Sequence, residues 1–526
     1  MKQHARKVGF VLALAGTFVL GGFLMPARAD QAGPRLFQEV LTLIAGRYVD
    51  SLDASALYEK AARGLIEELE DPYAALYSPE ELEAFTVAHE GHYGGVGMMV
   101  ENQEGTAVVA RVFPNTPSEH AGLQVGDRIV SVDGESTEGL ELEAVTARLK
   151  GEPGTEVSVG VVRRGVPRPI EVELTRAEIQ IPAVPYTLVL ENGTGYLPLL
   201  QFGETAAEEV EAAVRELIDQ GATSLVLDLR GNGGGIVDDA IEIAGLFLPK
   251  GTLIARQWER GGSDLLYRSP AEPLAPDLPL VVLLDEWSAS ASEIVAGALQ
   301  DHDRAMLIGE TSFGKGLIQS AYRLNGGYIL KFTTGKWFTP SGRTIHRERE
   351  VVNGSLVAVR DTAAADTSLA ARPTFRSDAG RTIYGGGGIV PDLIVKPDTL
   401  NAAEQAFVKA IVPHSQDVYL TLFDYAFELK EQVAPDFVVT EAWRDELFRR
   451  LQERGIEVDR ELYDGASSYV DRMIEDRVAR LAFGDDEAKR RALRDDAPLV
   501  RALDLLGAGW TQDDLLTQAT RAGVGG

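Results

Sequence analysis

Apolar positions recur with two different periods along the first third of the chain. Between residues 35 and 78 they return every three or four positions, which predicts a pair of helices that ends at Asp71-Pro72. Between residues 80 and 175 they alternate in short runs separated by turn residues, which predicts a small β domain. Asp133-Gly134, between two of these runs, is typical of a β-hairpin turn. The predicted strands are 97–100, 107–112, 128–132 and 157–162.

Strand-like and helix-like runs alternate between residues 195 and 391, which predicts an α/β core. The segment at about 348–380 has little periodicity, so we expect a surface loop or flap there. From residue 401 onward helical spacing returns among many charged residues, which predicts a solvated helical domain. The predicted strands of the core are 194–200, 224–229, 280–284, 329–334 and 337–338, and the predicted helices are 206–219, 237–246 and one that begins after Ser290.

Residues 1–29 have the pattern of a secretory signal. The segment begins with basic residues, continues with an apolar stretch from Val8 to Leu24 and ends with Ala27-Arg28-Ala29, a small-x-small cleavage sequence. The apolar stretch is near the lower limit for spanning a bilayer, so an uncleaved N-terminal membrane anchor is the alternative. Under both hypotheses we expect the body of the chain to be periplasmic or otherwise extracytoplasmic.

The chain is acidic and contains no cysteine. Among its 526 residues, 80 are Asp or Glu and 51 are Lys or Arg, which gives a formal net charge of −29. This charge argues against nucleic acid and against an anionic membrane surface as partners. The absence of cysteine excludes disulfide bonds, thiolate metal sites and a cysteine nucleophile.

The stretch 284–319 carries the candidate chemistry. Ser288, Ser290 and Ser292 alternate with alanine where a predicted strand meets a predicted helix. Backbone N–H groups are unpaired at such a junction and the helix dipole favours negative charge, which suits a nucleophile whose attack creates an oxyanion. Lys315 follows twenty-five residues after Ser290, and Gln319 lies four residues further.

Three hypotheses fit this stretch. Ser290 and Glu293 form S-x-x-E before an apolar run, the pattern of a helix capping box without catalytic function. Residues 309–315 fit the phosphate-binding pattern G-x-x-x-x-G-K, but Gly316 stands where the Ser or Thr that holds Mg²⁺ belongs. The third hypothesis is a dyad in which a desolvated, neutral Lys315 is the general base for Ser290.

The spacing of SASASEI, Lys315 and Gln319 resembles that of the carboxy-terminal processing proteases, which are Ser–Lys peptidases with a PDZ domain. The resemblance covers residues 35–397 and implies that Ser290 is the nucleophile, Lys315 the general base and Gln319 the residue that orients the lysine. Ser288 and Ser292 are second choices for the nucleophile. A Ser-His-Asp triad is the competing arrangement, with His302, between two aspartates, as its candidate base. We expect His302 instead to end the helix that follows Ser290.

A glycine-rich loop, residues 230–235, follows the predicted strand 224–229. Its spacing, G-x-G-G-G, does not match the dinucleotide-binding fingerprint. The resemblance implies that the loop supplies N–H groups for an oxyanion, from Gly234 or Gly235 together with Ala291. Glycine allows the backbone to approach a substrate carbonyl closely. The sequence leaves open which glycine donates.

Two motifs of the β domain resemble those of PDZ domains: GGVGM at residues 94–98 and AGLQVGD at residues 121–127. The resemblance implies that Gly95, Val96, Gly97 and Met98 hold the C-terminal carboxylate of a peptide, which adds to the sheet as a strand. The alternative is that these glycines only permit a tight turn.

Together these features predict a multidomain α/β protein with an inserted, β-barrel-like PDZ domain and a helical C-terminal domain. The predicted function is an extracytoplasmic serine endopeptidase that binds protein or peptide substrates by their C-termini and requires no metal or organic cofactor. The alternative is a non-catalytic PDZ scaffold with a protease-like fold, and a homodimer is left open. The predicted boundaries are 1–29 for the signal or anchor, 30–79 for the N-terminal helices, 80–178 for the PDZ domain, 179–400 for the Ser–Lys protease core with its insertion at about 348–380, and 401–526 for the helical domain.

Overall fold

The computed structural model describes residues 32–523, apart from 51–52, 83–91, 104–105, 114, 125, 164–165, 167, 181, 191, 263, 353–354, 359–371 and 509–510. The predicted signal at residues 1–29 therefore lies outside the described residues. The chain divides into two compact units, residues 1–71 and 72–526. None of the helices in the described part of the chain has the length and apolar character needed to cross a membrane.

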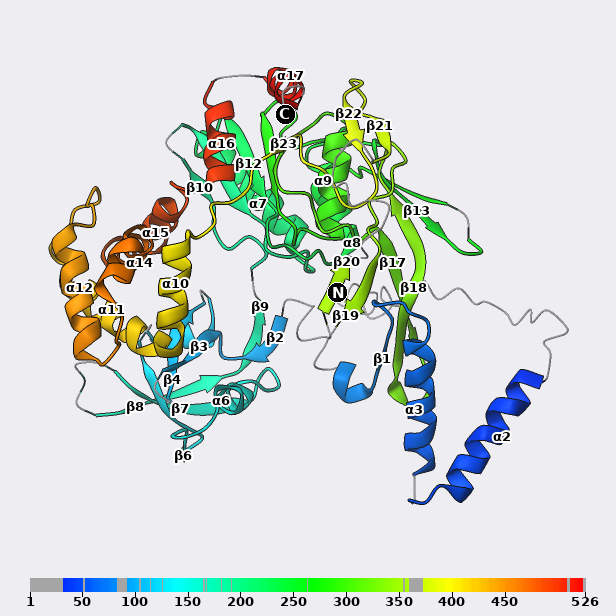
Figure 1. Cartoon of the computed structure of the whole chain (residues 1–526), viewed down its shortest axis with the longest axis horizontal. Helices are drawn as coiled ribbons and strands as arrows, with labels where there is room; N and C mark the ends of the chain where they lie inside the picture. The colour runs from blue at the N-terminus through cyan, green and yellow to red at the C-terminus, as the bar shows by residue number, and fades with distance from the viewer. Residues whose placement is uncertain are drawn as a thin grey trace, which may run out of the picture. The chain divides into compact units, whose positions relative to one another are not determined.

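The first unit contains two helices that contact each other, α2 (Ala32–Arg47) and α3 (Ala54–Glu67) (Figure 1). Asp53 caps α3, because its Oδ2 accepts a hydrogen bond from the Ala56 N–H at 3.0 Å. Several apolar side chains of α2 are exposed, among them Leu36 at 64% and Phe37 at 55%. The predicted helices are present, and their apolar residues are not fully buried within the unit.

A small β domain occupies residues 92–180 of the second unit. Its elements are β2 (His92–Gly95), β3 (Met98–Gln103), β4 (Thr106–Val112), α5 (Pro117–His120), β5 (Arg128–Val132), β6 (Glu135–Ser136), α6 (Leu142–Leu149), β7 (Glu156–Val162), β8 (Ile170–Thr175) and β9 (Ala177–Gln180). The main sheet is antiparallel with the order β3-β4-β5-β7-β8; β6 pairs with β5, and β2 pairs with β9. Asp133 and Gly134 both have positive φ, 51° and 75°, and form the predicted hairpin turn. β3 is the edge strand and lies beside α6.

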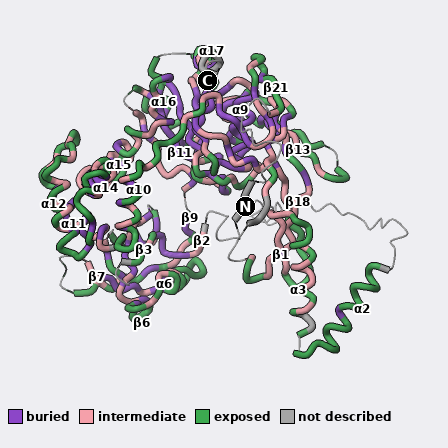
Figure 2. Tube along the Cα trace, in the orientation of Figure 1, coloured by how far each residue is buried: buried purple, intermediate pink, exposed green. Residues whose placement is uncertain are grey.

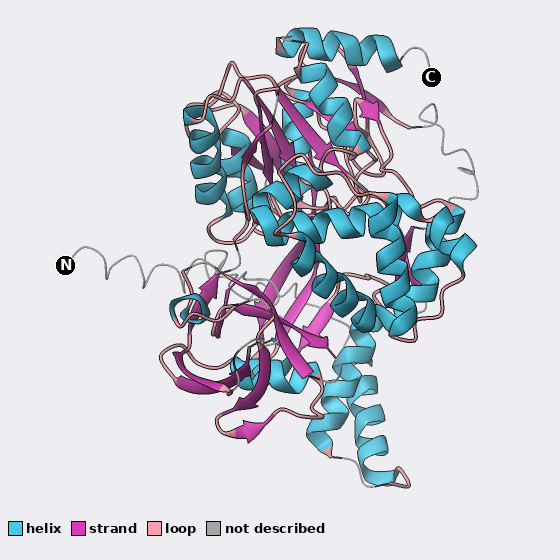
Figure 3. Cartoon of the chain, turned by 90° about the vertical axis from the view of Figure 1, so that its left-hand side faces the viewer, coloured by secondary structure: helices cyan, strands magenta, loops and turns pink. Residues whose placement is uncertain are grey.

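The centre of the second unit is a six-stranded sheet with helices on its faces (Figure 3). All neighbouring strands are parallel except for the first pair. A parallel sheet covered on both sides needs strands that are apolar throughout, which explains the continuous apolar runs in the sequence. In spatial order the strands are β10 (Leu188–Val189), β11 (Thr194–Pro198), β12 (Ser224–Asp228), β15 (Leu280–Leu284), β16 (Met306–Gly309) and β23 (Leu393–Ile394).

Side chains along each strand alternate between two apolar clusters. Leu225 and Leu227 of β12 pack with α7 (Ala206–Asp219), α8 (Val237–Gly245) and α9 (Ala291–Asp301), while Val226 faces the opposite side. Figure 2 shows this region as the main buried part of the molecule.

The last two helices, α16 (Ala497–Leu506) and α17 (Gln512–Gly523), cover the side of the sheet that Val226 faces. Leu499 and Leu515 belong to the same apolar cluster as Val226. The predicted boundary at residue 401 is therefore wrong for these two helices, which complete the α/β core. The reason is that a parallel sheet buries both of its faces, and the helices before residue 401 cover only one.

The helices between the core and α16 form a cluster of their own, centred on Phe407, Tyr463 and Val470. They agree with the helical domain that the sequence predicted for this part of the chain. The helices are α10 (Ala402–Ile411), α11 (Ser415–Leu429), α12 (Glu441–Glu453), α13 (Arg460–Gly465), α14 (Ser467–Phe483) and α15 (Asp485–Ala492), with 3₁₀ turns such as Val412–His414 between them.

A second, antiparallel sheet contains β1 (Ala75–Tyr77), β13 (Leu253–Glu259), β14 (Leu265–Arg268), β17 (Leu317–Arg323) and β18 (Ile329–Phe338). β17 was not predicted, and β18 is one strand where two were predicted. Gly335 interrupts the apolar pattern of β18, yet the strand continues through it. Glycine is required here because a Cβ would lie 2.3 Å from the Trp258 carbonyl oxygen of β13.

The segment predicted as a loop at about 348–380 contains short strands where it is described. β19 (Arg349–Val352) pairs with β20 (Ser355–Ala358), and β21 (Thr374–Arg376) pairs with β22 (Thr382–Tyr384). The sequence predicted a surface loop or flap without strands, and the strands were missed because three or four residues are too few to show periodicity. Residues 353–354 and 359–371 of the segment lie outside the described residues.

Candidate active site

Ser290 occupies the turn between strand β15 and helix α9. Its backbone angles, φ 56° and ψ −109°, lie in a region that residues other than glycine rarely adopt. The surroundings hold this conformation, since every residue of α9 is buried. Strained strand-to-helix turns also present the nucleophilic serine of α/β-hydrolases. The Ser290 side chain is thus placed where a nucleophile is expected.

The hydroxyl groups of the two neighbouring serines are committed to structural hydrogen bonds. Ser288 Oγ donates to the Leu229 carbonyl at 2.9 Å, and Ser292 Oγ donates to the Asn232 carbonyl at 2.9 Å. Both serines are fully buried. In the described part of the chain, no carbonyl group accepts a hydrogen bond from Ser290 Oγ. The Ser290 side chain instead takes part in a capping box, in which it accepts the N–H group of Glu293.

Glu293 joins the Ser290 turn to the Lys315 loop. Its Oε2 accepts the N–H groups of Ser290 and Lys315 at 2.9 and 2.8 Å. Its Oε1 accepts the Ser312 hydroxyl at 2.6 Å and the Gly314 N–H at 2.7 Å. Burial raises the pKa of Glu293, and these four donors oppose the shift. The sequence indicated only the capping half of this arrangement, because Ser312 and Gly314 are distant along the chain.

Lys315 lies in the loop between β16 and β17, with its Nζ 5.4 Å from the centre of the Tyr73 ring. Burial lowers the pKa of Lys315, the charge of Lys331 lowers it further, and Glu293 opposes the shift. A lowered pKa increases the fraction of neutral amine, which is the form that accepts a proton. The N–H groups of Gly314 and Lys315 are bound to Glu293 rather than open to a phosphate, which argues against the phosphate-loop hypothesis.

Gly234 lies against the Ser290 turn, and the next residue, Gly235, lies against Phe202. A Cβ on Gly234, whose φ is 98°, would lie 2.8 Å from Ser290 Cβ and 3.0 Å from the Ala291 nitrogen, so only glycine fits there. The Gly234 N–H already donates to Asn232 Oδ1 at 2.9 Å. The N–H groups of Gly235 and Ala291 donate to no residue that the structure describes. Of the two glycines, Gly235 alone has an N–H group without a partner among the described residues, and the oxyanion role of either glycine stays a prediction.

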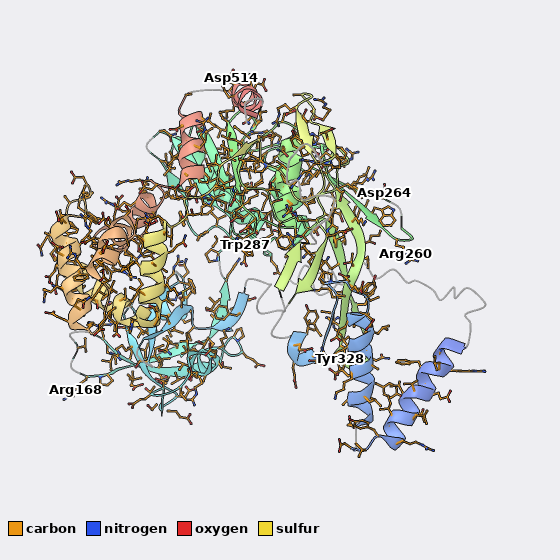
Figure 4. The ribbon with its side chains drawn as sticks, in the orientation of Figure 1. Arg168, Arg260, Asp264, Trp287, Tyr328 and Asp514 are labelled. Atoms are coloured by element: carbon orange, nitrogen blue, oxygen red, sulfur yellow. The ribbon has the colours of Figure 1, made fainter. Side chains whose placement is uncertain are left out.

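Asp285 and Asn232 fix the glycine loop against the nucleophile turn. The Asp285 carboxylate accepts the Gly231 N–H at 3.0 Å, and the Asn232 carbonyl accepts the Ala289 N–H at 3.0 Å. Trp287, in the same loop as Asp285, is 63% exposed (Figure 4). The sequence-based reasoning overlooked both polar residues, although Asp and Asn in turn positions next to Gly and Ser are a recognisable signal.

Residues 95–98 connect β2 to the edge strand β3. A Cβ on Gly97, whose φ is 82°, would lie 2.2 Å from Thr116 Cβ, so the turn itself requires this glycine. The Phe113 N–H donates to the Gly97 carbonyl, and Met98 faces Val112 in the ladder. The Phe113–Gly97 hydrogen bond makes Met98 and Val112 a non-hydrogen-bonded pair of the ladder. The backbone N–H and C=O of Met98 therefore point away from β4, to the open edge of the sheet. Turn formation and strand addition are therefore compatible at this site.

Comparisons with known proteins agree with this geometry. Residues 193–352 match the model of peptidase family S41, and residues 108–163 match that of PDZ domains, a class of peptide-binding modules. The chain is 34% identical over 313 residues to a carboxy-terminal-processing protease of Bartonella bacilliformis, covering 59% of this chain and 71% of that protein. The chain belongs to the carboxy-terminal processing proteases.

As a member of this family the chain is a serine-type peptidase with a PDZ domain, which favours an enzyme over the scaffold alternative. It is also 33% identical over 305 residues to the carboxy-terminal processing protease CtpA of Bacillus subtilis, covering 58% of this chain and 65% of that protein. Among solved structures, the photosystem II D1 C-terminal processing protease is 28% identical with a TM-score of 0.35, covering 62% of this chain and 92% of that chain.

Gln319 of this processing protease lies on β17, opposite Thr333 of β18. Its Nε2 is buried and has no hydrogen-bond partner among the described residues. No hydrogen bond to Lys315 is present in this part of the structure, so the orienting role of Gln319 stays a prediction.

His302 ends α9, as expected from the sequence, and lies at the opposite end of the helix from Ser290. An eleven-residue helix is about 16 Å long. Its Nδ1 lies 2.7 Å from Asp378 Oδ2, and its Nε2 lies 2.7 Å from the Leu253 carbonyl oxygen. His302 is therefore not the base of a triad with Ser290.

Proposed function

We propose that this chain is an extracytoplasmic serine endopeptidase that cleaves with a dyad of Ser290 and Lys315 and recognises substrates by their C-termini. The observation that carries the proposal is that one oxygen, Glu293 Oε2, binds the N–H groups of both Ser290 and Lys315. A capping residue needs only the first of these bonds. The second bond brings the loop of a buried lysine to the strained turn of the serine.

In the proposed reaction, Ser290 Oγ attacks the carbonyl carbon of the scissile bond, and its proton passes to the neutral Nζ of Lys315. The N–H groups of Ala291 and Gly235 donate to the resulting oxyanion. The C–N bond then breaks, and the leaving amine takes the proton from Nζ. Water then attacks the acyl-enzyme and gives a proton to Nζ of Lys315, the acyl–Oγ bond breaks, and Ser290 Oγ takes that proton from Nζ. Gln319 orients the lysine amine without adding charge.

The PDZ domain is proposed to capture the C-terminus of the substrate. The supporting observations are the open edge of β3, the outward-facing backbone of Met98 and the Gly97 N–H, which donates to no described residue. A peptide strand placed between β3 and α6 would pair with Met98 and direct its carboxylate to the turn at Gly95, Val96 and Gly97.

The proposed extracytoplasmic location rests on the sequence of residues 1–29 alone. Fractionation of cells that express the full chain, followed by N-terminal sequencing, tests it. A mature N-terminus at residue 30 indicates a cleaved signal, an intact N-terminus in the membrane fraction indicates an anchor, and cytosolic protein contradicts the proposal.

We further propose that α2 and α3 contribute to a homodimer. The supporting observation is the exposed apolar side chains of the unit, including Leu36, Phe37 and Leu65, the last at 69%. Light scattering of the chain from residue 32 should report a dimer that Phe37→Glu dissociates, whereas Gln38→Glu on the same helix should leave it intact. A monomeric parent protein would contradict this proposal.

Cleavage of an unfolded protein with an apolar C-terminus tests the dyad. We expect cleavage by the parent protein and by Lys336→Ala, a change at an exposed lysine of β18, and none by Ser290→Ala or Lys315→Ala. Labelling by a fluorophosphonate should occur at Ser290 in the parent protein. Cleavage by Ser290→Ala at the parent rate would show that the nucleophile is assigned wrongly.

A further inference from the structure

Arg347, Arg349 and Arg372 form a group of cations beside the Lys315 loop. The Arg347 N–H donates to the Gly314 carbonyl at 2.9 Å, and the Arg349 guanidinium donates to the Phe313 carbonyl. The guanidinium carbon of Arg349 also lies 3.4 Å from the centre of the Phe313 ring. None of the three side chains pairs with a carboxylate in the described part of the chain; their acceptors are backbone carbonyls.

The guanidinium groups of Arg347 and Arg372 converge on a single backbone carbonyl. Gly387 O accepts a hydrogen bond from Arg347 Nη2 and another from Arg372 Nη1, the latter at 3.4 Å. Gly387 has a φ of 92°, and a Cβ on it would lie 3.4 Å from Arg347 Nε and 3.7 Å from Arg372 Nη2. A side chain at this position would therefore be in van der Waals contact with both guanidinium groups.

This arrangement places like charges together without a direct carboxylate partner among the described residues. Burial lowers the pKa of both Arg347 and Arg372, and the charges of Arg349 and Arg372 lower the pKa of Arg347 further. The charges of Glu293 and Glu286 oppose this shift for Arg347, but no carboxylate that the structure describes makes a hydrogen bond or ion pair with either guanidinium group. Unpaired, half-buried cations are costly, and an arriving anion would remove that cost.

We propose that Arg347 and Arg372 bind a carboxylate group of the peptide substrate. A guanidinium fork matches a carboxylate in a bidentate manner, and neither of these two forks is paired with a carboxylate that the structure describes. Two residues, Gly314 and Glu293, connect the site to the nucleophile. The Arg347 N–H donates to the Gly314 carbonyl, and the Glu293 carboxylate accepts the N–H groups of Gly314 and Ser290. The identity of the ligand rests on the proposed peptidase function. The carboxylate is supplied by an acidic side chain near the scissile bond or by the C-terminus of the peptide.

Peptide binding to the full chain carrying Ser290→Ala tests the site without cleavage. Three fluorescent peptides share one sequence: one has an internal Glu and an amidated C-terminus, one has Gln and a free C-terminus, and one has Gln and an amidated C-terminus. Each is titrated into this protein and into versions that also carry Arg347→Gln, Arg372→Gln or the control Arg376→Gln. Arg376 is exposed and binds Gly380 O and Thr382 Oγ1, outside the cluster. The PDZ domain is identical in all four proteins, so its contribution cancels in the comparison.

We expect Arg347→Gln and Arg372→Gln to weaken binding of a carboxylate-bearing peptide about tenfold and to leave the neutral peptide unchanged. Loss for the Glu peptide identifies an acidic side chain as the source, and loss for the free C-terminus identifies the terminal carboxylate. Equal effects on all three peptides, or none, would overturn the proposal. The melting temperature should not fall in Arg372→Gln, because this change removes an unpaired cation, and a fall would indicate a structural role.

The same proteins without Ser290→Ala separate this inference from the proposed function. If the parent chain cleaves peptides but the arginine changes leave binding of all three unaltered, the carboxylate site fails and the peptidase stands. If binding depends on the arginines while the parent chain cleaves nothing, the site stands and the proposed reaction fails.

Discussion

Ser290 and Lys315 are linked through a single atom, because their backbone N–H groups donate to the same oxygen of Glu293 at 2.9 and 2.8 Å. The two residues are twenty-five positions apart and come from different loops. Glu293 itself is fully buried at the third position of α9. The relative position of the proposed nucleophile and base therefore depends on a carboxylate that takes no part in the bond-breaking steps.

Glu293→Gln should reduce kcat about 10- to 100-fold with little change in KM. All four partners of Glu293 are donors, so one pair of them would face the amide NH₂ of glutamine and lose its acceptor. The change also removes a charge that raises the pKa of Lys315, so the rise of kcat/KM with pH should move to lower pH. Steady-state kinetics across pH measure both effects. Glu286→Gln, at an exposed position four residues before Ser290, is the control, and parent-like kcat in Glu293→Gln would contradict the linking role.

Lys331→Gln should move the pH dependence in the opposite direction. The Lys331 charge lowers the pKa of Lys315, so its removal raises that pKa and decreases the neutral amine at any given pH. The kcat/KM curve should therefore rise at higher pH than in the parent protein, with a few-fold loss near neutral pH. Lys336→Gln removes an exposed charge from the same strand and should leave the curve in place. An unchanged curve in Lys331→Gln would argue against Lys315 as the base.

Lys315→Met should abolish cleavage and at the same time stabilise the fold by about 1 kcal/mol near neutral pH. Burial lowers the pKa of Lys315 below its ordinary value of 10.5, so the folded state binds fewer protons than the unfolded state between the two values. The lysine therefore destabilises the fold below its folded pKa, and this cost disappears above pH 10.5. Urea unfolding of both proteins at several pH values measures the difference. Lower stability of Lys315→Met at neutral pH would be inconsistent with an unfavourably buried lysine.

Ser288→Ala and Ser292→Ala should lose stability, about 1–3 kcal/mol each, and keep the nucleophile. Their hydroxyls donate to the Leu229 and Asn232 carbonyls, so alanine removes one of the two hydrogen bonds that each of these buried carbonyls accepts. Peptide mapping after fluorophosphonate treatment should find the label on Ser290 in both variants. A label on Ser288 or Ser292 in the parent protein would reverse the assignment.

Asp496→Ser should show that the last helices support the catalytic loop. Asp496 Oδ1 accepts Arg230 Nη1 at 2.9 Å and also caps α16 by accepting the Leu499 N–H at 3.0 Å. Serine retains the cap but does not reach Arg230, which begins the glycine-rich loop. We expect a loss of about 1–3 kcal/mol in unfolding free energy and a several-fold lower kcat, with Asp504→Ser, at an exposed position of α16, as the control. Equal behaviour of the two variants would place the last helices outside the catalytic machinery.

Local patterns in the sequence were sufficient for much of the fold. The helix at residues 206–219 and the strand at 280–284 were predicted with the bounds that the structure has, because long amphipathic periods and continuous apolar runs depend on neighbours in the chain. Short strands such as β19 and β20, with four residues each, were not found, because so few residues cannot display a period. The predicted domain boundary at residue 401 was wrong for α16 for another reason, because the pattern of a helix does not reveal which surface the helix covers.

For the candidate site, the amino-acid sequence by itself determined which residue types stand at chemically informative spacings: three serines, Lys315, Gln319 and a run of glycines. It did not distinguish a capping Ser290 from a reactive one, nor Gly234 from Gly235. Tertiary structure bears on those points, because they depend on which hydrogen bonds are already made: the hydroxyls of Ser288 and Ser292 donate to carbonyls about sixty residues away, and the Gly234 N–H donates to the Asn232 side chain, whereas the Gly235 N–H has no partner among the described residues. Contacts between distant segments also make Glu293 the link between the two loops and bring Arg347 together with Arg372. No local pattern in the sequence encodes either arrangement.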